Sequence, residues 1–294
     1  MTADITEIKR FAVHDGDGIR TTVFFSGCPL RCLWCHNPET FGRKPRLMFY
    51  RHKCVGCQKC GEVCACHTFD AGEHRIDREK CTACGRCAAV CPTEALTVSG
   101  RKMTVEEITE VLLRDREFYE NSGGGITLSG GECLTQPEAC VAILRRMREE
   151  GIDTAVDTCG YVPREVIRSV MPHTTTFLYD LKAIDEKVHE KCTGKSNKII
   201  LDNLRFLLKS SARVEIRYPY VPGYNDGEAG AIASFLSTLP PVVRVRVLPY
   251  HNYAASKYAA LGMAHVLPDR LPTKEEISKA EAVFRRHGIP CGEE

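Results

Sequence analysis

The sequence predicts an α/β protein, a partial (β/α)6 barrel interrupted by a small cysteine-rich domain. Short apolar, β-branched runs alternate with helix-like segments along most of the 294 residues, which indicates βα units. Nine of the 17 cysteines fall between Cys54 and Cys91, where this alternation is interrupted. Polar motifs follow the strand-like runs, as they do in barrel enzymes. We therefore expect the barrel in residues 1–46 and 101–294 and the insert in residues 47–100.

The strands of the barrel are predicted from short runs of β-branched and apolar residues. One strand precedes the insert and five follow it. In chain order they are Ile19–Phe25, Ile126–Ser129, Ile152–Asp157, Thr175–Leu181, Arg213–Tyr218 and Val242–Leu248. Six βα units imply a parallel sheet with right-handed crossovers, and they are too few to close an eight-stranded barrel. The barrel is therefore expected to remain open.

The helices between these strands are predicted from apolar positions spaced by 3.6 residues. Thr104 and Glu107 form a capping-box pattern, and the helix that follows is expected to present Ile108, Val111, Leu112 and Phe118 near one face. Later helices are expected at about Gln136–Glu150, Pro163–Val170, Asn197–Ser210, Glu228–Thr238 and Lys274–His287.

The composition of the chain argues against a nucleic-acid-binding, membrane or secreted protein. Lys plus Arg number 40 and Asp plus Glu number 38, so the chain lacks the strong positive charge that would indicate binding to nucleic acid or to an acidic membrane surface. The N-terminus has no apolar signal core, and no run of about 18 apolar residues suggests a membrane span, so a cytoplasmic protein is expected. In that compartment 17 cysteines favour metal over disulfides. Exposed metal centres bound by cysteines are often sensitive to oxygen, which points to an anaerobic or facultative host.

Cys28, Cys32 and Cys35 stand as C-x3-C-x2-C, with Trp34 just before the last cysteine. Three closely spaced thiolates can hold a four-iron cluster and leave one iron without a protein ligand. An open metal position invites a substrate or cofactor, as it does in catalytic zinc sites. A zinc site that adds His36 is the alternative, but adjacent Cys35 and His36 cannot easily both face one tetrahedral ion.

The insert carries two matching C-x2-C-x2-C-x3-C runs, the second followed by Pro92. Bacterial two-cluster ferredoxins have this spacing, and the fourth cysteine of each run ligates the other cluster. The expected ligand sets are Cys54, Cys57, Cys60 and Cys91 for one cluster and Cys64, Cys81, Cys84 and Cys87 for the other. Ala65 replaces the usual proline after Cys64, and Cys66 is an alternative ligand in place of Cys64. Zinc ribbons, or a unit that has lost one cluster, are the other possibilities.

Polar motifs follow all six predicted strands, at the end where barrel enzymes form their active sites. Gly130 and Gly131 allow close backbone approach to a ligand, and Glu132 can accept a hydrogen bond from an ammonium group. Each motif alone could be an ordinary turn, cap or surface residue. The candidates at this rim are Cys28, Cys32, Cys35, Gly130, Gly131, Glu132, Asp157, Thr158, Asp180, Lys182, Arg217 and His251.

Six segments occur in a characteristic order: HDGDGIRTTVFFSGCPLRCLWCHNPET, SGGE, DTCG, DLK, VPGYND and LPYH. In this order they resemble the glycyl radical enzyme activating enzymes of the radical S-adenosylmethionine (SAM) superfamily, which includes pyruvate formate-lyase activase. The insert resembles the ferredoxin-like domain with two [4Fe-4S] clusters that many of these activases carry. The family commonly has DGPG where this chain has Asp15-Gly16-Asp17-Gly18, and the loss of proline removes a fixed φ.

The resemblance implies SAM and three [4Fe-4S] clusters as cofactors. SAM would bind the iron left open by the C-x3-C-x2-C cysteines, with the GGE motif holding its amino group and Trp34 nearby. Asp157, Thr158 and Asp180 match residues that bind a monovalent cation beside the SAM carboxylate. Arg217 and His251 match residues that line the SAM pocket, whereas Lys182 belongs either to the site or to the solvated surface. Asp15 and Arg20 are expected to receive a glycine loop of the partner.

The implied reaction is reductive cleavage of SAM to methionine and a 5′-deoxyadenosyl radical, which removes hydrogen from a glycine α-carbon in a partner glycyl radical enzyme. A ferredoxin or flavodoxin is the expected electron donor, and the insert clusters are the expected relay. The chain is expected to be a monomer that docks transiently. A radical SAM enzyme acting on a small molecule or other peptide, and a non-catalytic electron carrier, are the alternatives. Nothing in the sequence separates the possible glycyl radical partners.

Overall fold

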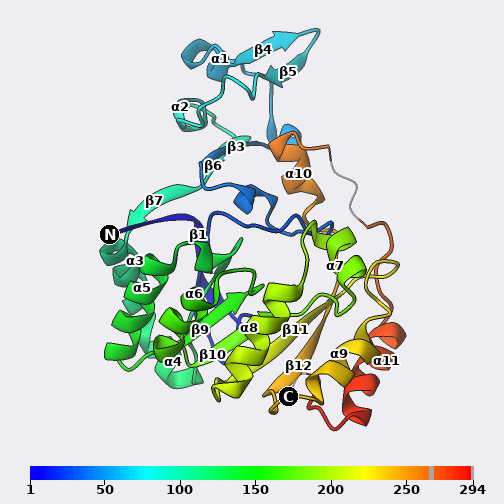
Figure 1. Cartoon of the computed structure of the whole chain (residues 1–294). Helices are drawn as coiled ribbons and strands as arrows, with labels where there is room; N and C mark the ends of the chain where they lie inside the picture. Colours follow the sequence, from blue (N-terminus) through cyan, green and yellow to red (C-terminus); the bar gives the residue numbers. More distant parts are fainter. Residues whose placement is uncertain (265–267, 293–294) are drawn as a thin grey trace.

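The computed structural model of the chain describes residues 1–264 and 268–292 and is built around one eight-stranded sheet. The strand order is β12-β11-β10-β9-β8-β2-β1-β7 (Figure 1). Neighbouring strands from β2 to β12 pair in parallel, which confirms the predicted α/β class and its mostly parallel sheet. These six strands are β2 (Arg20–Phe25), β8 (Gly125–Gly130), β9 (Asp153–Thr158), β10 (Thr176–Asp180), β11 (Val214–Tyr220) and β12 (Arg244–Pro249).

Two further strands extend this sheet and were not predicted. β1 (Thr2–Ala12) pairs antiparallel with β2, and β7 (Arg101–Thr104) pairs antiparallel with β1. Ala3 and Ile5 of β1 are buried and alternate with more exposed residues. This period-2 alternation is the sequence pattern that could have identified the strand.

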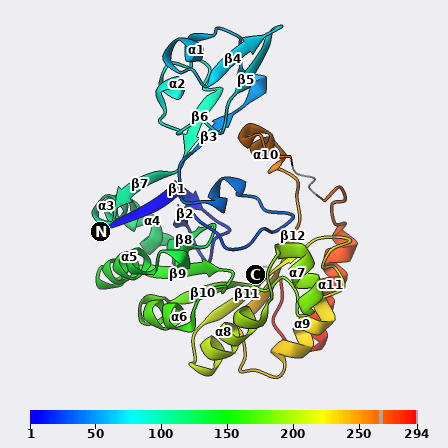
Figure 2. The same cartoon turned by 45° about the horizontal axis from the view of Figure 1, so that its top comes forward.

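Helices cover the outer face of the curved sheet (Figures 1 and 2). Within α5 (Pro137–Glu149), the buried residues Ala139, Cys140, Ile143, Leu144 and Met147 recur at helical spacing, so one stripe faces the sheet. The other helices that flank the sheet are α3 (Val105–Leu113), α4 (Arg116–Ser122), α6 (Arg164–Val170), α8 (Lys198–Lys209), α9 (Ala229–Leu236) and α11 (Lys274–Arg286).

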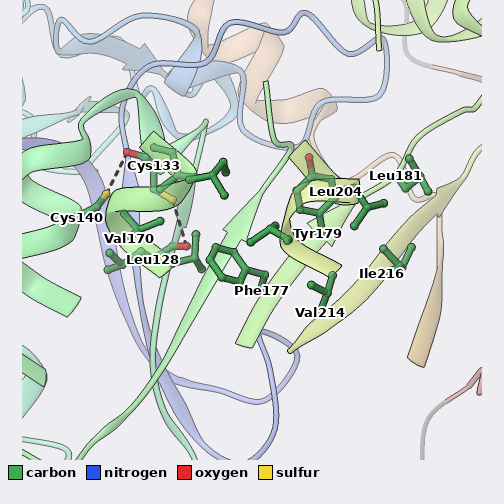
Figure 3. Close-up of a cluster of buried hydrophobic side chains, with 14 of the residues drawn as sticks. Leu128, Cys133, Cys140, Val170, Phe177, Tyr179, Leu181, Leu204, Val214 and Ile216 are labelled. Carbon is green, nitrogen blue, oxygen red and sulfur yellow. Dashed lines mark hydrogen bonds between the residues drawn. The ribbon is translucent and has the colours of Figure 1, made fainter. Parts of the chain in front are cut away.

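The main core lies between the sheet and these helices (Figure 3). Phe177 and Tyr179 of β10 lie two residues apart and point to the same face, as strand geometry requires. Leu204 of α8 packs in the same cluster, and the Tyr179 hydroxyl donates a hydrogen bond to the Ile200 carbonyl at 2.7 Å. The tyrosine thus brings a satisfied polar group into the apolar layer.

The start of α3 is confirmed and the extent of its apolar face is corrected. Thr104 and Glu107 form the predicted capping box. The helix ends at Leu113, however, and Phe118 lies in the separate helix α4, where it is 44% exposed. Its ring packs edge-on against Phe11 at a centroid distance of 4.9 Å. The prediction that Phe118 shares a face with Ile108 was wrong because the chain breaks its helical period between α3 and α4.

Residues 46–99 form two small antiparallel sheets outside the main sheet. A β-α-β arrangement occurs twice in this segment. The first copy is β3 (Arg46–Phe49), α1 (Lys59–Val63) and β4 (His67–Asp70), and the second is β5 (Glu73–Ile76), α2 (Arg86–Ala89) and β6 (Leu96–Ser99). β3 pairs with β6 and β4 pairs with β5. Figure 1 shows this insert projecting beyond the sheet, next to α10 (Ala255–Leu261). Met48 packs there against Ala260 and Leu261.

The remaining short elements are α7 (Glu186–Thr193) and the 3-10 helices η1 (Pro38–Phe41), η2 (Arg51–Lys53), η3 (Cys133–Thr135) and η4 (Met171–His173). Neither α7 nor α10 was predicted. In the part of the chain that the structure describes, no helix has the length and hydropathy required of a membrane span.

Candidate active site

A cavity of about 620 Å³ lies at the carboxyl ends of the parallel strands. This is the edge where parallel α/β folds place their active sites. Most of the residues predicted for the rim border this one space. They are Cys28, Cys32, Trp34, Cys35, Gly130, Gly131, Asp157, Asp180, Lys182, Arg217 and His251, together with Asp15.

The three cysteines of the C-x3-C-x2-C motif lie on the loop that follows β2. Burial raises the pKa of Cys28 to about 12 and raises the pKa values of Cys32 and Cys35 as well. Free thiols here are therefore protonated near neutral pH, and a metal has to displace their protons. The positive charge of Lys182 favours the Cys32 thiolate, and the backbone N–H of Asn37 donates to Cys35 Sγ at 3.4 Å. Three thiols facing one cavity fit a cluster that keeps one iron open.

The two glycines after β8 bring bare backbone to the edge of the cavity. Gly130 has a φ of +118°, and a Cβ added there would lie 2.2 Å from the backbone N of Phe25. At Gly131 an added Cβ would lie 2.5 Å from the carbonyl oxygen of Gly27. The close packing of this turn against the loop after β2 therefore requires glycine at both positions.

Glu132 lies behind the cavity and does not line it. Its side chain is buried, and its carboxylate accepts hydrogen bonds from Thr158 Oγ1 at 2.9 Å and from the backbone N–H groups of Cys159 and Leu134. Thr158 is likewise buried and turned towards Glu132. The structure therefore gives these two side chains a role in holding the turns after β8 and β9. The expectation that Glu132 accepts from an ammonium group stays a prediction.

Charged side chains alternate in sign around the cavity. Lys182 Nζ lies 2.6 Å from Asp180 Oδ2, and Arg217 Nη1 lies 3.6 Å from Asp157 Oδ2. Burial raises the pKa of Asp157 to about 6, although Arg217 and the Ser129 hydroxyl favour its charged form. Burial alone would lower the pKa of Lys182, but the carboxylate of Asp180 and the sulfur of Cys32 raise it, so Lys182 stays charged.

Among the described residues, His14, His36 and His251 border the cavity, and only His251 was expected in the SAM pocket. His36 stacks on His251 with ring centroids 3.8 Å apart, and its Nε2 lies 3.0 Å from the His251 carbonyl oxygen. Burial lowers the pKa of His36 to about 4 and also lowers the pKa of His251, so both stacked rings are neutral at pH 7. His14 presents its carbonyl to Arg217 Nη2 at 2.8 Å. His14 stands directly before Asp15, which is the only sequence feature that could have indicated it.

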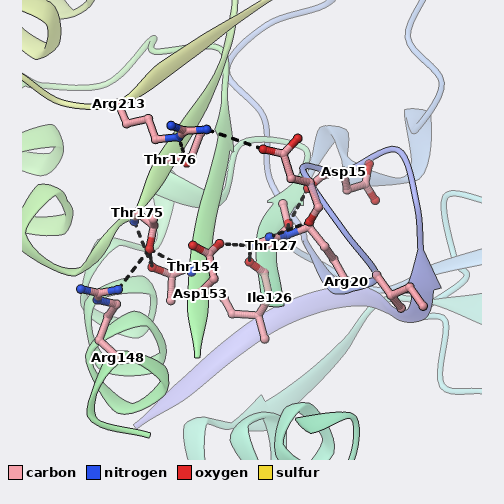
Figure 4. A network of polar contacts seen from close by, with 12 residues as sticks. Asp15, Arg20, Ile126, Thr127, Arg148, Asp153, Thr154, Thr175, Thr176 and Arg213 are labelled. Atoms are coloured by element: carbon pink, nitrogen blue, oxygen red, sulfur yellow. Dashed lines mark hydrogen bonds and ion pairs between the residues drawn. The ribbon is translucent and has the colours of Figure 1, made fainter. Parts of the chain in front are cut away.

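Asp15 and Arg20 are linked through Thr127, whose hydroxyl accepts from Arg20 Nε at 2.8 Å and donates to the Asp15 carbonyl at 2.6 Å. Asp15 borders the cavity and accepts a hydrogen bond from Thr22 Oγ1 at 2.7 Å. Arg20 is the first residue of β2, is 2% exposed, and donates to the Asp17 carbonyl at 3.2 Å. Figure 4 shows its guanidinium bonded to Thr127 and Asp153. Arg20 is buried beneath the loop that carries Asp15, and the expected partner contacts of both residues stay predictions.

Residues 77–236 match the radical SAM superfamily. The choline trimethylamine-lyase activating enzyme of Oleidesulfovibrio alaskensis is 40% identical over 298 residues, covering 97% of this chain and 96% of that protein. The trans-4-hydroxy-L-proline dehydratase activating enzyme of Clostridioides difficile is 38% identical over 291 residues, covering 97% and 96%. The chain belongs to the glycyl radical enzyme activating enzymes. Members of this family are radical SAM enzymes, which bind SAM at a [4Fe-4S] cluster.

The fold of this activating enzyme agrees with that membership. The crystal structure of a domain of pyruvate-formate lyase-activating enzyme from Bacteroides vulgatus ATCC 8482 covers 57% of this chain and 98% of its own length, with 30% identity and a TM-score of 0.50. The family match at residues 77–236 contains β8 to β11 with their turns, whereas the C-x3-C-x2-C motif lies before it, on the other side of the insert.

In the insert of the activating enzyme, one predicted ligand set surrounds a single small cavity. Cys54, Cys57, Cys60 and Cys91 all line it, although Cys91 lies far from the others in sequence. This is the crossed arrangement that the ferredoxin spacing predicts. In the second set, the pKa of Cys87 is raised by burial and by the neighbouring sulfurs of Cys64 and Cys81.

Cys66 lies close to the second set. Burial raises the pKa of its thiol, and a contact with the side chain of Cys64 raises it further. Cys84 is exposed, and hydrogen bonds from Arg86 lower its pKa. Both Cys64 and Cys66 therefore lie beside the sulfurs of the second set.

Proposed function

We propose that this activating enzyme binds SAM in the cavity at the strand ends and removes a hydrogen atom from a glycine of a partner glycyl radical enzyme. The observation that carries the proposal is that three thiols, a bare Gly130-Gly131 backbone and alternating charges border one space of about 620 Å³. Similarity to activating enzymes over 97% of the chain supports the same activity.

Different residues of the cavity would bind the cluster, the amino group of SAM and the carboxylate of SAM. Cys28, Cys32 and Cys35 would hold the [4Fe-4S] cluster, which supplies the electron that cleaves SAM. The backbone of Gly130 and Gly131 would meet the methionyl amino group, because no side chain stands between it and the cavity. A buried guanidinium suits a carboxylate, and Arg217 Nε has no hydrogen-bond partner among the described residues.

Other residues of the cavity would complete the pocket. Asp157 and Asp180 border it from adjacent strands, and their carboxylates would hold a monovalent cation beside the SAM carboxylate. The stacked rings of His36 and His251, with Trp34, form an apolar and aromatic wall that suits adenine. Asp15 stands at the mouth with His14, where the glycine loop of the partner would enter.

The insert would act as a ferredoxin-like domain with two [4Fe-4S] clusters that receive electrons. Cys54, Cys57, Cys60 and Cys91 would hold one of them. A groove of about 810 Å³ lies between the insert and α10, and its charged lining is basic: Arg51, His52, Arg75 and Arg78. This groove, which we call the basic groove, suits an acidic electron carrier such as a ferredoxin or flavodoxin. We propose that the enzyme works as a cytoplasmic monomer that docks both partners transiently.

Anaerobic electron paramagnetic resonance tests the proposed activity. Reconstituted enzyme, SAM and reductant are mixed with each member of a panel of purified glycyl radical enzymes. We expect a glycine-centred doublet with one panel member, and no doublet with the Cys32→Ser variant of the activating enzyme. Formation of 5′-deoxyadenosine without a doublet from any panel member would instead indicate a small molecule or another peptide as the substrate. Absence of both would contradict SAM cleavage altogether.

A further inference from the structure

Two histidines of the β4–β5 hairpin lie against the cysteine cavity of the insert. His67 and His74 are each only 6% exposed. The Nδ1 atom of His74 lies 3.8 Å from Cys54 Sγ, and its Nε2 atom lies 3.8 Å from Cys60 Sγ. On the other side, His74 Nε2 lies 2.8 Å from His67 Nδ1. The two imidazoles therefore form a short chain that ends on the thiols of Cys54 and Cys60.

The chemistry of a metal-bound thiolate determines the direction of the hydrogen bonds in this chain. Buried imidazoles are neutral, and a neutral imidazole has one N–H. Both ring nitrogens of His74 face a sulfur, but Nε2 lies 2.8 Å from His67 Nδ1 and 3.8 Å from Cys60 Sγ, so its main partner is His67. We therefore assign the hydrogen to Nδ1, which faces Cys54 alone, because a thiolate can only accept. The Nε2 atom of His74 is then an acceptor, and His67 Nδ1 must be the donor. His67 Nε2 is left as a lone pair, which agrees with the finding that this buried atom has no partner in residues 1–264 and 268–292.

We propose that His74, oriented by His67, donates its Nδ1–H to the thiolate of Cys54 and raises the reduction potential of the insert cluster held by Cys54, Cys57, Cys60 and Cys91. The proposal rests on the proposed presence of that cluster. A donor at a ligating sulfur stabilises the added negative charge of the reduced form more than the oxidised form. A second partner that fixes the tautomer of such a histidine is a common arrangement around metal centres.

Packing holds the His74 ring in place independently of the metal. It stacks on Phe69 at a centroid distance of 4.6 Å and meets Phe49 edge-on at 4.4 Å. His74 also borders the basic groove, so its ring separates the groove from the cysteine cavity. The ring is therefore placed to influence the cluster next to the groove where an electron donor would dock.

A single metal ion is the competing interpretation, because Cys60, His67 and His74 offer ligand atoms within 4.8 Å of one another. The geometry favours the hydrogen-bonded chain instead. The two nitrogens that face each other, His67 Nδ1 and His74 Nε2, are already at hydrogen-bond distance. Cys60 is also one of the four cysteines around the shared cavity, and a separate ion would take it from that set.

The test is a redox titration of the full chain that carries Cys28→Ser, Cys32→Ser and Cys35→Ser, so that only the insert clusters contribute signals. Midpoint potentials are read by electron paramagnetic resonance after anaerobic reconstitution, with iron and zinc measured on the same samples. His74→Phe keeps the aromatic packing but removes the donor. His74→Asn keeps an N–H near the Nδ1 position. His67→Phe removes only the residue that orients the ring, and His52→Phe is the matched control in the same insert.

In His74→Phe we expect the equilibrium constant for one-electron reduction of one cluster to fall about tenfold, a shift of about 59 mV to lower potential. His74→Asn should restore part of the lost potential, His67→Phe should give a smaller shift in the same direction, and His52→Phe should give none.

Unchanged potentials in both His74→Phe and His67→Phe, with iron content intact, would overturn the proposal. Loss of about one zinc or iron ion per chain in these variants would overturn it in favour of a single-ion site. Absence of any cluster in the starting protein would instead contradict the proposed role of the insert.

Discussion

The carboxylate of Asp17 pairs with the guanidinium of Arg244, which joins the loop before β2 to the first residue of β12. Arg246 and Arg213 approach the same carboxylate at 3.6 and 3.7 Å. These contacts connect the two ends of the parallel part of an open sheet. Asp17 stands where the family commonly carries a proline. The ion pairs therefore hold a loop that a proline ring would otherwise restrain.

We predict that Asp17→Asn lowers the free energy of unfolding by less than about 1 kcal/mol at pH 7 and low salt. The effect is small because Asp17 is 55% exposed. Burial would raise the pKa of Asp17, but its hydrogen bond with Arg244 and the charges of Arg244, Arg246 and Arg213 lower it overall, so its stabilising contribution is present above pH 4 and is lost as the pH falls further. Urea denaturation of wild type and variant at low salt and at 1 M NaCl checks this, because salt should remove the difference. A difference that persists in high salt would contradict an electrostatic origin.

Asp157→Asn should stabilise the metal-free protein at alkaline pH while abolishing activation. Burial raises the pKa of Asp157 from an ordinary 3.8 to about 6, so its ionisation opposes folding as the pH rises through 6. This shift lowers the free energy of unfolding of the wild type by about 3 kcal/mol at pH 8 and by almost nothing below pH 4, and Asp157→Asn should recover that amount. Denaturation of the apoprotein at these two pH values measures it. An equal difference between variant and wild type at both pH values would contradict the assignment.

Gly130→Ala should lower the free energy of unfolding by about 3 kcal/mol or more, because the new Cβ would meet backbone atoms at a φ unfavourable for alanine. The added Cβ would lie 2.2 Å from the backbone nitrogen of Phe25. Gly227→Ala is the control, since no atom lies within 4 Å of a Cβ added there. Thermal unfolding and SAM binding by calorimetry provide the measurements. If Gly130→Ala were as stable as Gly227→Ala, the close packing of this turn would be disproved.

Reversing charge in the basic groove should slow electron entry. In Arg51→Glu/Arg75→Glu, we expect reduction of the clusters by a reduced flavodoxin to be at least about tenfold slower at low salt, because the groove would no longer attract an acidic carrier. Stopped-flow absorbance records this rate, and reduction by dithionite should be unchanged. Arg114→Glu/Arg145→Glu is the matched control, because Arg114 directly follows α3, Arg145 lies in α5, and both are exposed. Equal rates in both double variants would place the docking surface elsewhere.

Much of the site could be predicted because strand ends in a parallel sheet share one edge. Cys28, Gly130, Asp157, Asp180 and Arg217 each follow or end a strand that local pattern identifies, and the fold then brings them to one cavity. No long-range information is needed to expect this meeting, only the period of the strands and their parallel order.

Residues whose role depends on what a side chain faces could not be placed in this way. Glu132 and Thr158 belong to rim motifs, yet the structure turns them towards each other behind the cavity. Arg20 was expected to contact a partner, but its side chain is buried and bonds Thr127 of β8 and Asp153 of β9. The buried pair of His67 and His74 carries no motif at all.

The sequence alone indicated the family, through the resemblance of six segments, and the parallel α/β class, through its hydrophobic period, because both are local patterns of the chain. Only the tertiary structure decided that β1 and β7 extend the sheet, that Asp17 reaches β12, and that His74 lies on the thiols of Cys54 and Cys60. These contacts join residues that are separated along the chain. They are set by packing and by the pairing of buried or charged groups. The physical reason is that burial and partner choice are properties of the folded arrangement, which no local pattern records.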